Sequence, residues 1–359
     1  MIRALFLSFF LIFSLLAGER DISLSFNFFA ANNAISLKNI TSSWEGDYKT
    51  PKNRFITLLF SDFEIKYKKD DSFCISYILK SNFVLRASSD FADLLHTVKT
   101  EGDLPIGRVY DLSLFAEGFI ADGLKVKNKV YERKTGDLFY RLDFSFSLLN
   151  GRFVQDLKID GFASAIGKKS YSFLSDVEYY YSENYLYDLD VNGPKGFGYD
   201  SSLAFKLRYK KYSFDLNVDN LLGRIYWQDT PFSDVHLKSD NAVTDENGYT
   251  KYNPSVYGYE GKKKFVQKLN RVWNLSLGYE FENFSFFLEE FYTAKISSPG
   301  CKVVKKFKNF SLSLKYENLF KTFTASVFNK NLFFSFGSDD FSLSKAKAFS
   351  LRGGFMYRF

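Results

Sequence analysis

The chain ends in the stretch FSLRGGFMYRF, residues 349–359, in which every second position from Phe349 to Phe359 is apolar or glycine. Side chains of a β-strand point alternately to the two faces of a sheet, so this stretch predicts a strand with one apolar face. The termini of soluble domains usually fray into water, and an apolar half-strand at the very end is unusual for them. The stretch therefore favours a strand that faces lipid.

The same alternation recurs along the chain and is most complete in residues 137–149. There Tyr140, Leu142 and Phe144 share one face of the predicted strand, and Arg141 and Asp143 share the other. Weaker copies of the pattern occupy residues 22–28, 205–209, 212–218 and 310–316. Apolar residues alternating with polar ones in segments of about ten residues are typical of a membrane β-barrel with a polar interior. We therefore predict an all-β fold.

Short polar links separate these runs and predict hairpin turns. They lie at residues 69–71, 150–151, 210–211, 282–283, 308–309 and 329–330. Three longer polar segments, near residues 31–53, 88–105 and 228–264, are predicted to be loops. The count of predicted strands is about 16 to 18, and merging weak pairs lowers it to 14. An even number places both termini on the inner side and all three loops on the outer side, as in bacterial outer-membrane barrels.

The first 18 residues have the pattern of a cleaved secretory signal. One positive charge at Arg3 precedes an apolar run from Ala4 to Leu16. That run is too short for a helix that must cross a membrane, which takes about 20 residues. We expect residues 19–359 to form a single antiparallel up-and-down barrel.

The tail carries a further pattern in Arg352, Gly354, Tyr357 and Phe359. It resembles the β-signal of Gram-negative outer-membrane proteins, which the assembly machinery of that membrane reads. The resemblance implies a porin-like barrel in the bacterial outer membrane, although no particular porin family is indicated. It implies as partners the outer-membrane lipid and lipopolysaccharide, the assembly machinery, small solutes and, for an oligomer, a homotrimer.

The predicted inner face carries many charges, and an isolated charge in a dry interior costs several kcal/mol. A barrel of about 16 strands also leaves an aqueous path unless something fills it. We therefore expect a pore for passive diffusion of small hydrophilic solutes. The candidate lining residues are Glu64, Lys66, Glu117, Arg141, Asp143, Asp156, Lys158, Lys206, Arg208, Asp215, Glu280 and Lys315.

The formal charge of +7 suggests a slight preference for anions if rings of charge set the selectivity. The basic residues are spread along the chain among 41 carboxylates and form no basic arm or helix. Such a distribution argues against nucleic-acid binding.

The segment near 228–264 is the candidate for a loop that folds inward and narrows the pore. Its alternative is an ordinary solvated loop. The charged candidates for a constriction are Asp229, Asp234, Asp240, Asp245, Glu246, Lys262, Lys263 and Lys264. The acidic spacing does not match a calcium-binding loop, so no metal is expected.

No catalytic motif is present, and we expect neither an enzyme nor a cofactor. The two histidines, His96 and His236, fall in predicted outer loops. Cys74 is predicted beside an inner turn and Cys301 in an outer one, too far apart for a disulfide.

Other functions remain as alternatives to the pore. The first is a structural or binding barrel with a closed lumen, followed by a transporter of hydrophobic compounds and then an outer-membrane hydrolase. A hydrophobic transporter usually has an N-terminal plug, and the first strand, near Ile22, leaves no room for one. The segment NLLGRIYW, residues 220–227, leads into the longest predicted loop, and the sequence suggests no role for it.

Overall fold

The computed structural model describes residues 20–359 except 41, 43, 69–71, 185–191, 240–241, 245–249, 253–254 and 359. The predicted signal segment and the last residue of the tail therefore lie outside the described part. No helix in that part is long and apolar enough to cross a membrane.

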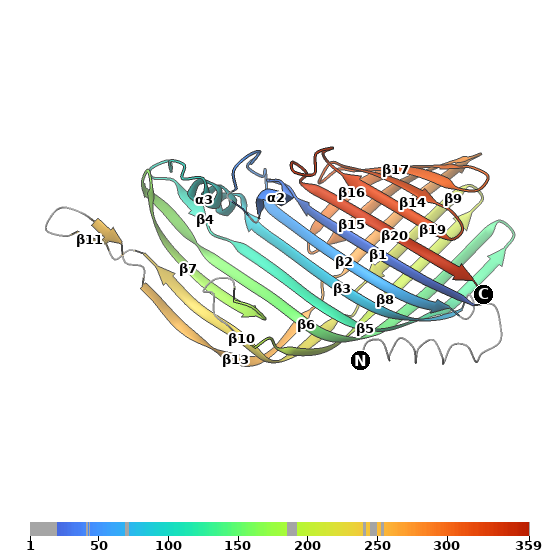
Figure 1. The fold of residues 1–359 in the computed structure, drawn as a ribbon, viewed down its shortest axis with the longest axis horizontal. Helices are drawn as coiled ribbons and strands as arrows, with labels where there is room; N and C mark the ends of the chain where they lie inside the picture. The colour runs from blue at the N-terminus through green and yellow to red at the C-terminus, as the bar shows by residue number, and fades with distance from the viewer. Residues whose placement is uncertain are drawn as a thin grey trace.

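The described chain is almost entirely β-structure, as predicted (Figure 1). Eighteen strands form one antiparallel sheet, and β11 and β12 form a separate hairpin. The strands are β1 (Asp21–Asn32), β2 (Arg54–Lys68), β3 (Phe73–Ser88), β4 (Val109–Asp111), β5 (Leu114–Thr135), β6 (Leu138–Gly167), β7 (Ser170–Tyr181), β8 (Lys195–Tyr209), β9 (Tyr212–Asp219), β10 (Arg224–Lys238), β11 (Ala242–Thr244), β12 (Thr250–Tyr252), β13 (Ser255–Lys268), β14 (Val272–Phe281), β15 (Phe284–Thr293), β16 (Ile296–Lys306), β17 (Ser311–Glu317), β18 (Thr322–Phe328), β19 (Leu332–Ser338) and β20 (Ala348–Arg358).

The sheet closes because β1 pairs with β20 on one edge and with β2 on the other. In the closing ladder Ile22 lies opposite Tyr357, and Ala31 lies opposite Ala348. Closure gives every strand of the circuit two partners, which a barrel in lipid requires because no water is there to satisfy an open edge. The up-and-down antiparallel barrel is confirmed.

Several of the eighteen strands continue one another along a shared line. Both β7 and β8 pair with β6, β9 leads into β10, and β13 leads into β14. The closed circuit of pairings in the described residues runs through β1, β2, β3, β5, β6, β8, β9, β14, β15, β16, β17, β18, β19, β20 and back to β1. The predicted range of 14 to 18 strands includes both the strands of the closed circuit and the full eighteen-stranded sheet.

One side of the barrel is much taller than the other. The upper part of β6 pairs with β7, and β7, β10 and β13 extend beyond the closed circuit at the end opposite the C-terminus (Figure 1). The strands from β14 to β20 have at most 11 residues, whereas β6 has 30. The sheet thus forms a closed lower barrel with an outer extension on one side.

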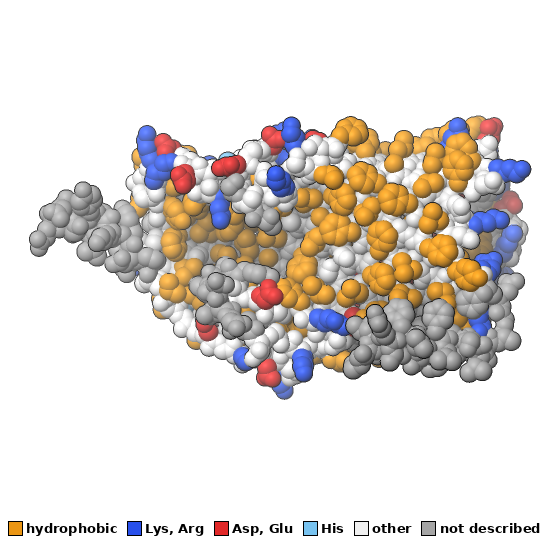
Figure 2. All heavy atoms as spheres, in the orientation of Figure 1, with side chains coloured by type: hydrophobic (Ala, Val, Ile, Leu, Met, Phe, Trp, Pro, Cys, Tyr) orange, Lys and Arg blue, Asp and Glu red, His pale blue; other side chains and the backbone are white. Residues whose placement is uncertain are grey.

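The outside of the barrel is apolar, and Figure 2 shows hydrophobic side chains spread over the wall of the closed part. Leu124, Phe144, Leu277, Leu314 and Phe355 all point outward and are exposed. Polar side chains occupy the alternate positions, which face the interior. The predicted apolar and polar faces are therefore the outer and inner faces of the wall.

Two predictions about local structure are wrong. Residues 150–151 form no turn, because Asn150 and Gly151 lie in the middle of β6 and pair with β8. The segment 228–264 is not a loop for most of its length, because β10 and β13 form a long hairpin there. The links at 210–211, 282–283, 308–309 and 329–330 do separate strands, and the link at 69–71 lies outside the described residues.

The two other predicted loops lie at the outer end and contain short helices, α2 (Leu37–Ile40) and α3 (Ser89–Lys99). Ser88 caps α3 by accepting a hydrogen bond from the backbone N–H of Phe91. Ala34, Trp44 and Ala92 are buried in one cluster with Phe55 and other wall residues. These segments are packed against the sheet rather than free in solvent.

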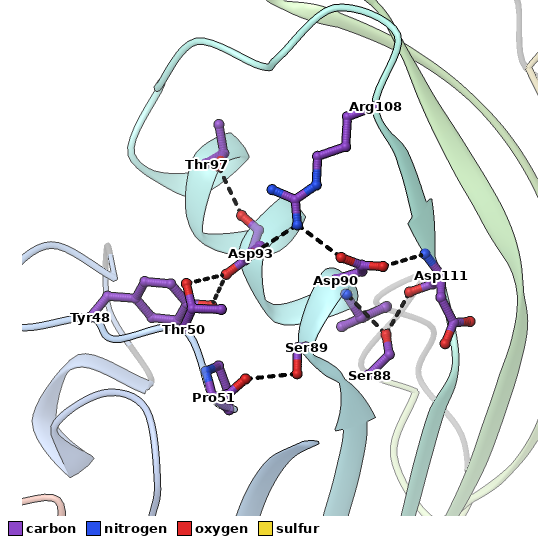
Figure 3. Close-up of polar contacts among 11 residues, drawn as sticks. Tyr48, Thr50, Pro51, Ser88, Ser89, Asp90, Asp93, Thr97, Arg108 and Asp111 are labelled. Carbon is purple, nitrogen blue, oxygen red and sulfur yellow. Dashed lines mark hydrogen bonds and ion pairs between the residues drawn. The ribbon is translucent and has the colours of Figure 1, made fainter. Parts of the chain in front are cut away.

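A network of polar contacts holds α3 to the neighbouring segments (Figure 3). Arg108 Nη2 lies 2.8 Å from Asp90 Oδ1 and 3.0 Å from Asp93 Oδ2. The other oxygen of Asp93 accepts hydrogen bonds from Tyr48 and Thr50 at 2.7 and 2.8 Å. Burial tends to raise the pKa of Asp93, but the hydrogen bonds from Tyr48, Thr50 and Arg108 outweigh it and hold the pKa below its ordinary value of 3.8.

Substitution of a lipid-facing leucine tests the assignment of faces. Leu314→Arg is expected to destabilise the barrel in lipid by about 2 to 4 kcal/mol, because it places a charge against the hydrocarbon. The adjacent inward substitution Lys315→Arg keeps its charge and should have little effect. Denaturant unfolding in lipid vesicles measures both, and equal effects would contradict the assignment.

The Asp93 network predicts a pH dependence at the outer end. Because the folded state lowers the pKa of Asp93, its stabilisation is complete above pH 3.8 and is lost as the pH falls through the lowered value. The protection factors of the α3 amides against hydrogen exchange, taken relative to the intrinsic rate at each pH, should therefore fall on acidification. Asp93→Asn should lower these protection factors already at pH 7 and flatten their pH dependence. A profile unchanged by the substitution would show that Asp93 does not hold the helix.

Candidate functional site

The lower barrel encloses a polar cavity of about 830 Å³. Strands from all around the circuit contribute to its walls, so the cavity is the lumen of the barrel. Its lining includes eight carboxylates and six cationic side chains: Asp62, Glu64, Asp200, Asp215, Asp219, Glu289, Glu290, Glu317, Lys80, Lys125, Lys127, Lys206, Lys315 and Arg352. The lining thus has more negative than positive groups, and the argument for anion preference from the charge of the whole chain does not hold for it.

The register places all twelve predicted lumen residues on the inner face, at three different levels. Glu64, Lys206, Asp215 and Lys315 line the cavity itself. Those toward the inner end are Lys66, Arg141, Asp143, Arg208 and Glu280. Those beyond the cavity, toward the outer extension, are Glu117, Asp156 and Lys158.

Many of the charges are paired along the wall. Arg208 Nη2 lies 2.8 Å from Asp215 Oδ2, and Arg141 Nε lies 2.9 Å from Asp143 Oδ1. Glu289 accepts from both Lys302 and Lys315. The Arg141–Asp143 pair lies within β6, and the other pairs join neighbouring strands or strands one apart, so all of them run along the wall.

At the outer end of the cavity the walls meet. Phe60 of β2 contacts Phe291 of β15, with ring centroids 6.0 Å apart. These two strands lie on opposite sides of the circuit, so the contact crosses the lumen. Phe29 contacts Phe320 in the same cluster, where Leu58 and Val84 are also fully buried.

A second apolar cluster lies beside the first, around Trp227. Trp227 is 0% exposed and packs with Phe119, Leu149 and Val154 on the inner face. Its indole Nε1 donates to Gln267 Oε1 at 3.2 Å, and Gln267 Nε2 donates to the carbonyl of Gly118 at 3.0 Å. These bonds tie β10 and β13 across the interior to β5. We call the Phe60 and Trp227 clusters together the aromatic layer.

The indole of Trp227 lies directly on the backbone of the wall. A Cβ atom on Gly151 would come within 2.5 Å of the ring, and one on Gly196 within 2.6 Å. Both positions therefore need glycine for the ring to fit. This gives a reason for glycine at position 151, which lies within β6 beside a register shift rather than in the turn that the Asn-Gly sequence suggests.

The described residues of the predicted constriction loop belong mostly to the β10–β13 hairpin. Asp234 lies in β10 and Lys262, Lys263 and Lys264 lie in β13, all in the outer extension, while Asp229 lies at a bulge with φ of 51°. Asp240, Asp245 and Glu246 lie outside the described residues. The aromatic layer, rather than a charged loop, narrows the described lumen.

The histidines and cysteines offer no catalytic set in the described chain. His236 Nδ1 lies 2.5 Å from Asp176 Oδ1 at the outer extension, and His96 is in α3. Cys74 and Cys301 are both free, and Cys301 lies in β16 rather than in an outer turn. No group of three or more metal-binding side chains occurs among the described residues.

The sequence did not single out the residues that close and charge the cavity. Lys80, Asp200 and Asp219 lie in strands with ordinary alternation, and their meeting depends on contacts over more than a hundred residues. Segment 220–227 did stand out in the sequence, and its last residue is Trp227. The signal in the sequence that could have indicated the buried cluster was the aromatic Trp227 at a position that faces inward.

Comparison with known proteins shows only a similarity of fold. No protein-family model and no curated protein matches the chain. Among solved structures it matches outer-membrane β-barrels. The TodX deltaS2S3 mutant, a monoaromatic hydrocarbon channel, is 8% identical with a TM-score of 0.43, covering 96% of this chain and 91% of that one.

Two other matches have different activities. The translocator domain of the autotransporter NalP from Neisseria meningitidis is 9% identical with a TM-score of 0.26, covering 100% of this chain and 95% of that one. The outer membrane protease OmpT from Escherichia coli is 9% identical with a TM-score of 0.22, covering 95% and 96%. Matches this distant carry no argument about function.

A double-mutant cycle tests the packing of Trp227. Gly196→Ala is expected to destabilise the barrel by about 1 to 3 kcal/mol, because the added carbon overlaps the indole. In a Trp227→Ala background the same substitution should cost less, since the ring is gone and only the close approach to Ile225 Cγ2, at 2.8 Å, remains. Unfolding by denaturant measures the four proteins. Equal costs in both backgrounds would mean that Trp227 does not lie on Gly196.

Proposed function

We propose that the protein is an outer-membrane channel for small hydrophilic solutes, and that the aromatic layer is its closed gate. The observation that carries the proposal is the polar cavity inside a barrel with an apolar outer wall. So many charges on one inner face favour a water-filled space. A path for solutes follows if the aromatic layer can separate.

The position of the layer supports a gate at one end. Its contacts join opposite walls at the outer end of the cavity, whereas the ion pairs nearer the inner end join neighbouring strands or strands one apart. Hydrophobic constrictions close channels by excluding water, and small displacements of their side chains restore a path. Transport then needs no covalent chemistry.

The outer membrane is the proposed location because the wall has an apolar belt and the sheet has no open edge in its closed circuit. The assembly machinery and lipid remain the expected partners. Gly354 of the predicted β-signal fits closely, since a Cβ there would lie 2.2 Å from the ring of Phe333. Tyr357 faces outward and is 59% exposed.

A closed structural or binding barrel is the second candidate. The aromatic layer favours it, because Trp227, Phe119 and Phe320 are buried in the layer while Phe60 and Phe291 are half-buried. A channel for hydrophobic compounds has less support, since the cavity below the layer is strongly charged. The two leading candidates differ in whether ions can cross the barrel.

Conductance in a planar bilayer separates them. The wild-type protein should give small or infrequent current steps, and Phe60→Ala should raise the mean current severalfold by removing the ring that meets Phe291. Phe144→Ala, which removes an outward ring of the same kind, is the matched control and should behave like the wild type. Silence of both the wild type and Phe60→Ala, with both proteins folded, would support the closed barrel instead.

A further inference from the structure

We infer that the cavity binds a small zwitterion, with its ammonium group at Asp62, Asp200 and Asp219 and its carboxylate at Arg352. The inference deepens the proposed channel by naming its class of solute. It rests on groups that line the cavity and keep unused hydrogen-bonding capacity, namely Asp200, Asp62 and Arg352, whereas Asp219 already accepts a hydrogen bond from Asn217 at 2.8 Å.

Lys80 lies among three carboxylates of the cavity wall. Its Nζ atom lies 3.0 Å from Asp200 Oδ2 and donates to Asn220 Oδ1 at 2.6 Å. Asp62 and Asp219 also act on it electrostatically but are not within ion-pair distance. One lysine therefore serves three carboxylates, and Lys125 is a second lysine that acts electrostatically on Asp62.

The carboxylates keep unused hydrogen-bonding capacity. Asp200 is only 3% exposed, and its Oδ1 atom has no hydrogen-bond partner. Among the described residues, Asp62 accepts a single, long hydrogen bond, 3.4 Å, from Asn27. A buried carboxylate oxygen without a partner costs free energy, so these oxygens favour a cationic donor from the solute.

Arg352 is the complementary group. It lines the cavity and keeps much of its surface exposed there, and no ion pair joins it to another described residue. Asp62 and Glu289 act on it electrostatically, and Glu289 is already engaged by Lys302 and Lys315. A free guanidinium offers a planar fork that fits a carboxylate with two parallel hydrogen bonds.

The two sets of groups lie in the same cavity and share a neighbour in Asp62. A cavity of 830 Å³ holds a small solute with its water. A solute with one positive and one negative group can satisfy both sets at once, which a singly charged solute cannot. An α-amino acid is the simplest example.

Isothermal titration of the full-length protein in detergent tests the inference with three matched probes. L-Alanine carries both charges, N-acetyl-L-alanine only the negative one, and L-alaninamide only the positive one. L-Alanine should bind about tenfold or more tightly than either analogue, given the usual strength of charged hydrogen bonds. Equal binding of all three, or no binding of L-alanine, would overturn the inference.

Substitutions assign the two halves of the site. Arg352→Gln should weaken L-alanine and N-acetyl-L-alanine about tenfold and leave L-alaninamide unchanged, and Asp62→Asn should do the reverse for the two analogues. Arg133→Gln and Asp103→Asn remove the same charges outside the cavity and serve as controls. Uniform loss with every probe would contradict the assignment. Because Arg352 is also in the predicted β-signal, Asp62→Asn keeps the test decisive if Arg352→Gln fails to fold.

Binding and conduction can fail separately. Binding of L-alanine by a protein that never conducts would contradict the channel and leave the site in place. Conductance without preference for L-alanine would contradict the site and leave the channel.

Discussion

The ladder between β1 and β20 joins Asp21 to Arg358 and closes the sheet on itself. An open sheet would leave a row of backbone N–H and C=O groups without partners in the hydrocarbon, at several kcal/mol for each. Once the edges are joined, every strand of the circuit has one face toward lipid and one toward the interior. The apolar belt, the polar cavity and the ion pairs along the wall all depend on that closure.

The interior combines a charged cavity, which favours water, with an apolar aromatic layer, which excludes it. The cavity carries charges that need water or partners, whereas the aromatic layer excludes water by bringing opposite walls together at Phe60 and Phe291. The bonds of Lys80 to Asp200 and Asn220 join β3 to β8 and to the residue that follows β9. The strength of such buried charged bonds means that any opening of the layer must preserve or replace them.

Alternation of apolar and polar residues predicted the class of fold and the inner face, because a strand's side chains have a period of two regardless of the rest of the chain. Glu64, Lys206, Asp215 and Lys315, which it assigned to the inner face, line the cavity. It failed where local sequence was ambiguous. Asn150-Gly151 has turn chemistry, but Gly151 is needed for the close approach of Trp227 from β10. The many charges of β10 and β13 suggested a loop, but these strands pair with each other in the outer extension, beyond the closed circuit.

The residues of the proposed site could not be predicted together, since Lys80 and Asp200 are 120 positions apart. The register of several intervening strands decides whether such residues meet. The aromatic layer could not be predicted for the same reason, because it depends on which strands from opposite walls of the barrel come into contact.

Cysteine accessibility tests most directly whether a hydrated cavity lies beneath a closed layer. Ser276→Cys places a thiol in the cavity wall, and Cys74→Ser with Cys301→Ser removes the two native thiols. In vesicles with the barrel in one orientation, a small charged thiol reagent should label this cysteine quickly from the inner side and slowly from the outer side. Adding Phe60→Ala should remove the difference. Equal labelling from both sides of the protein with an intact layer, or no labelling from either side, would contradict the account.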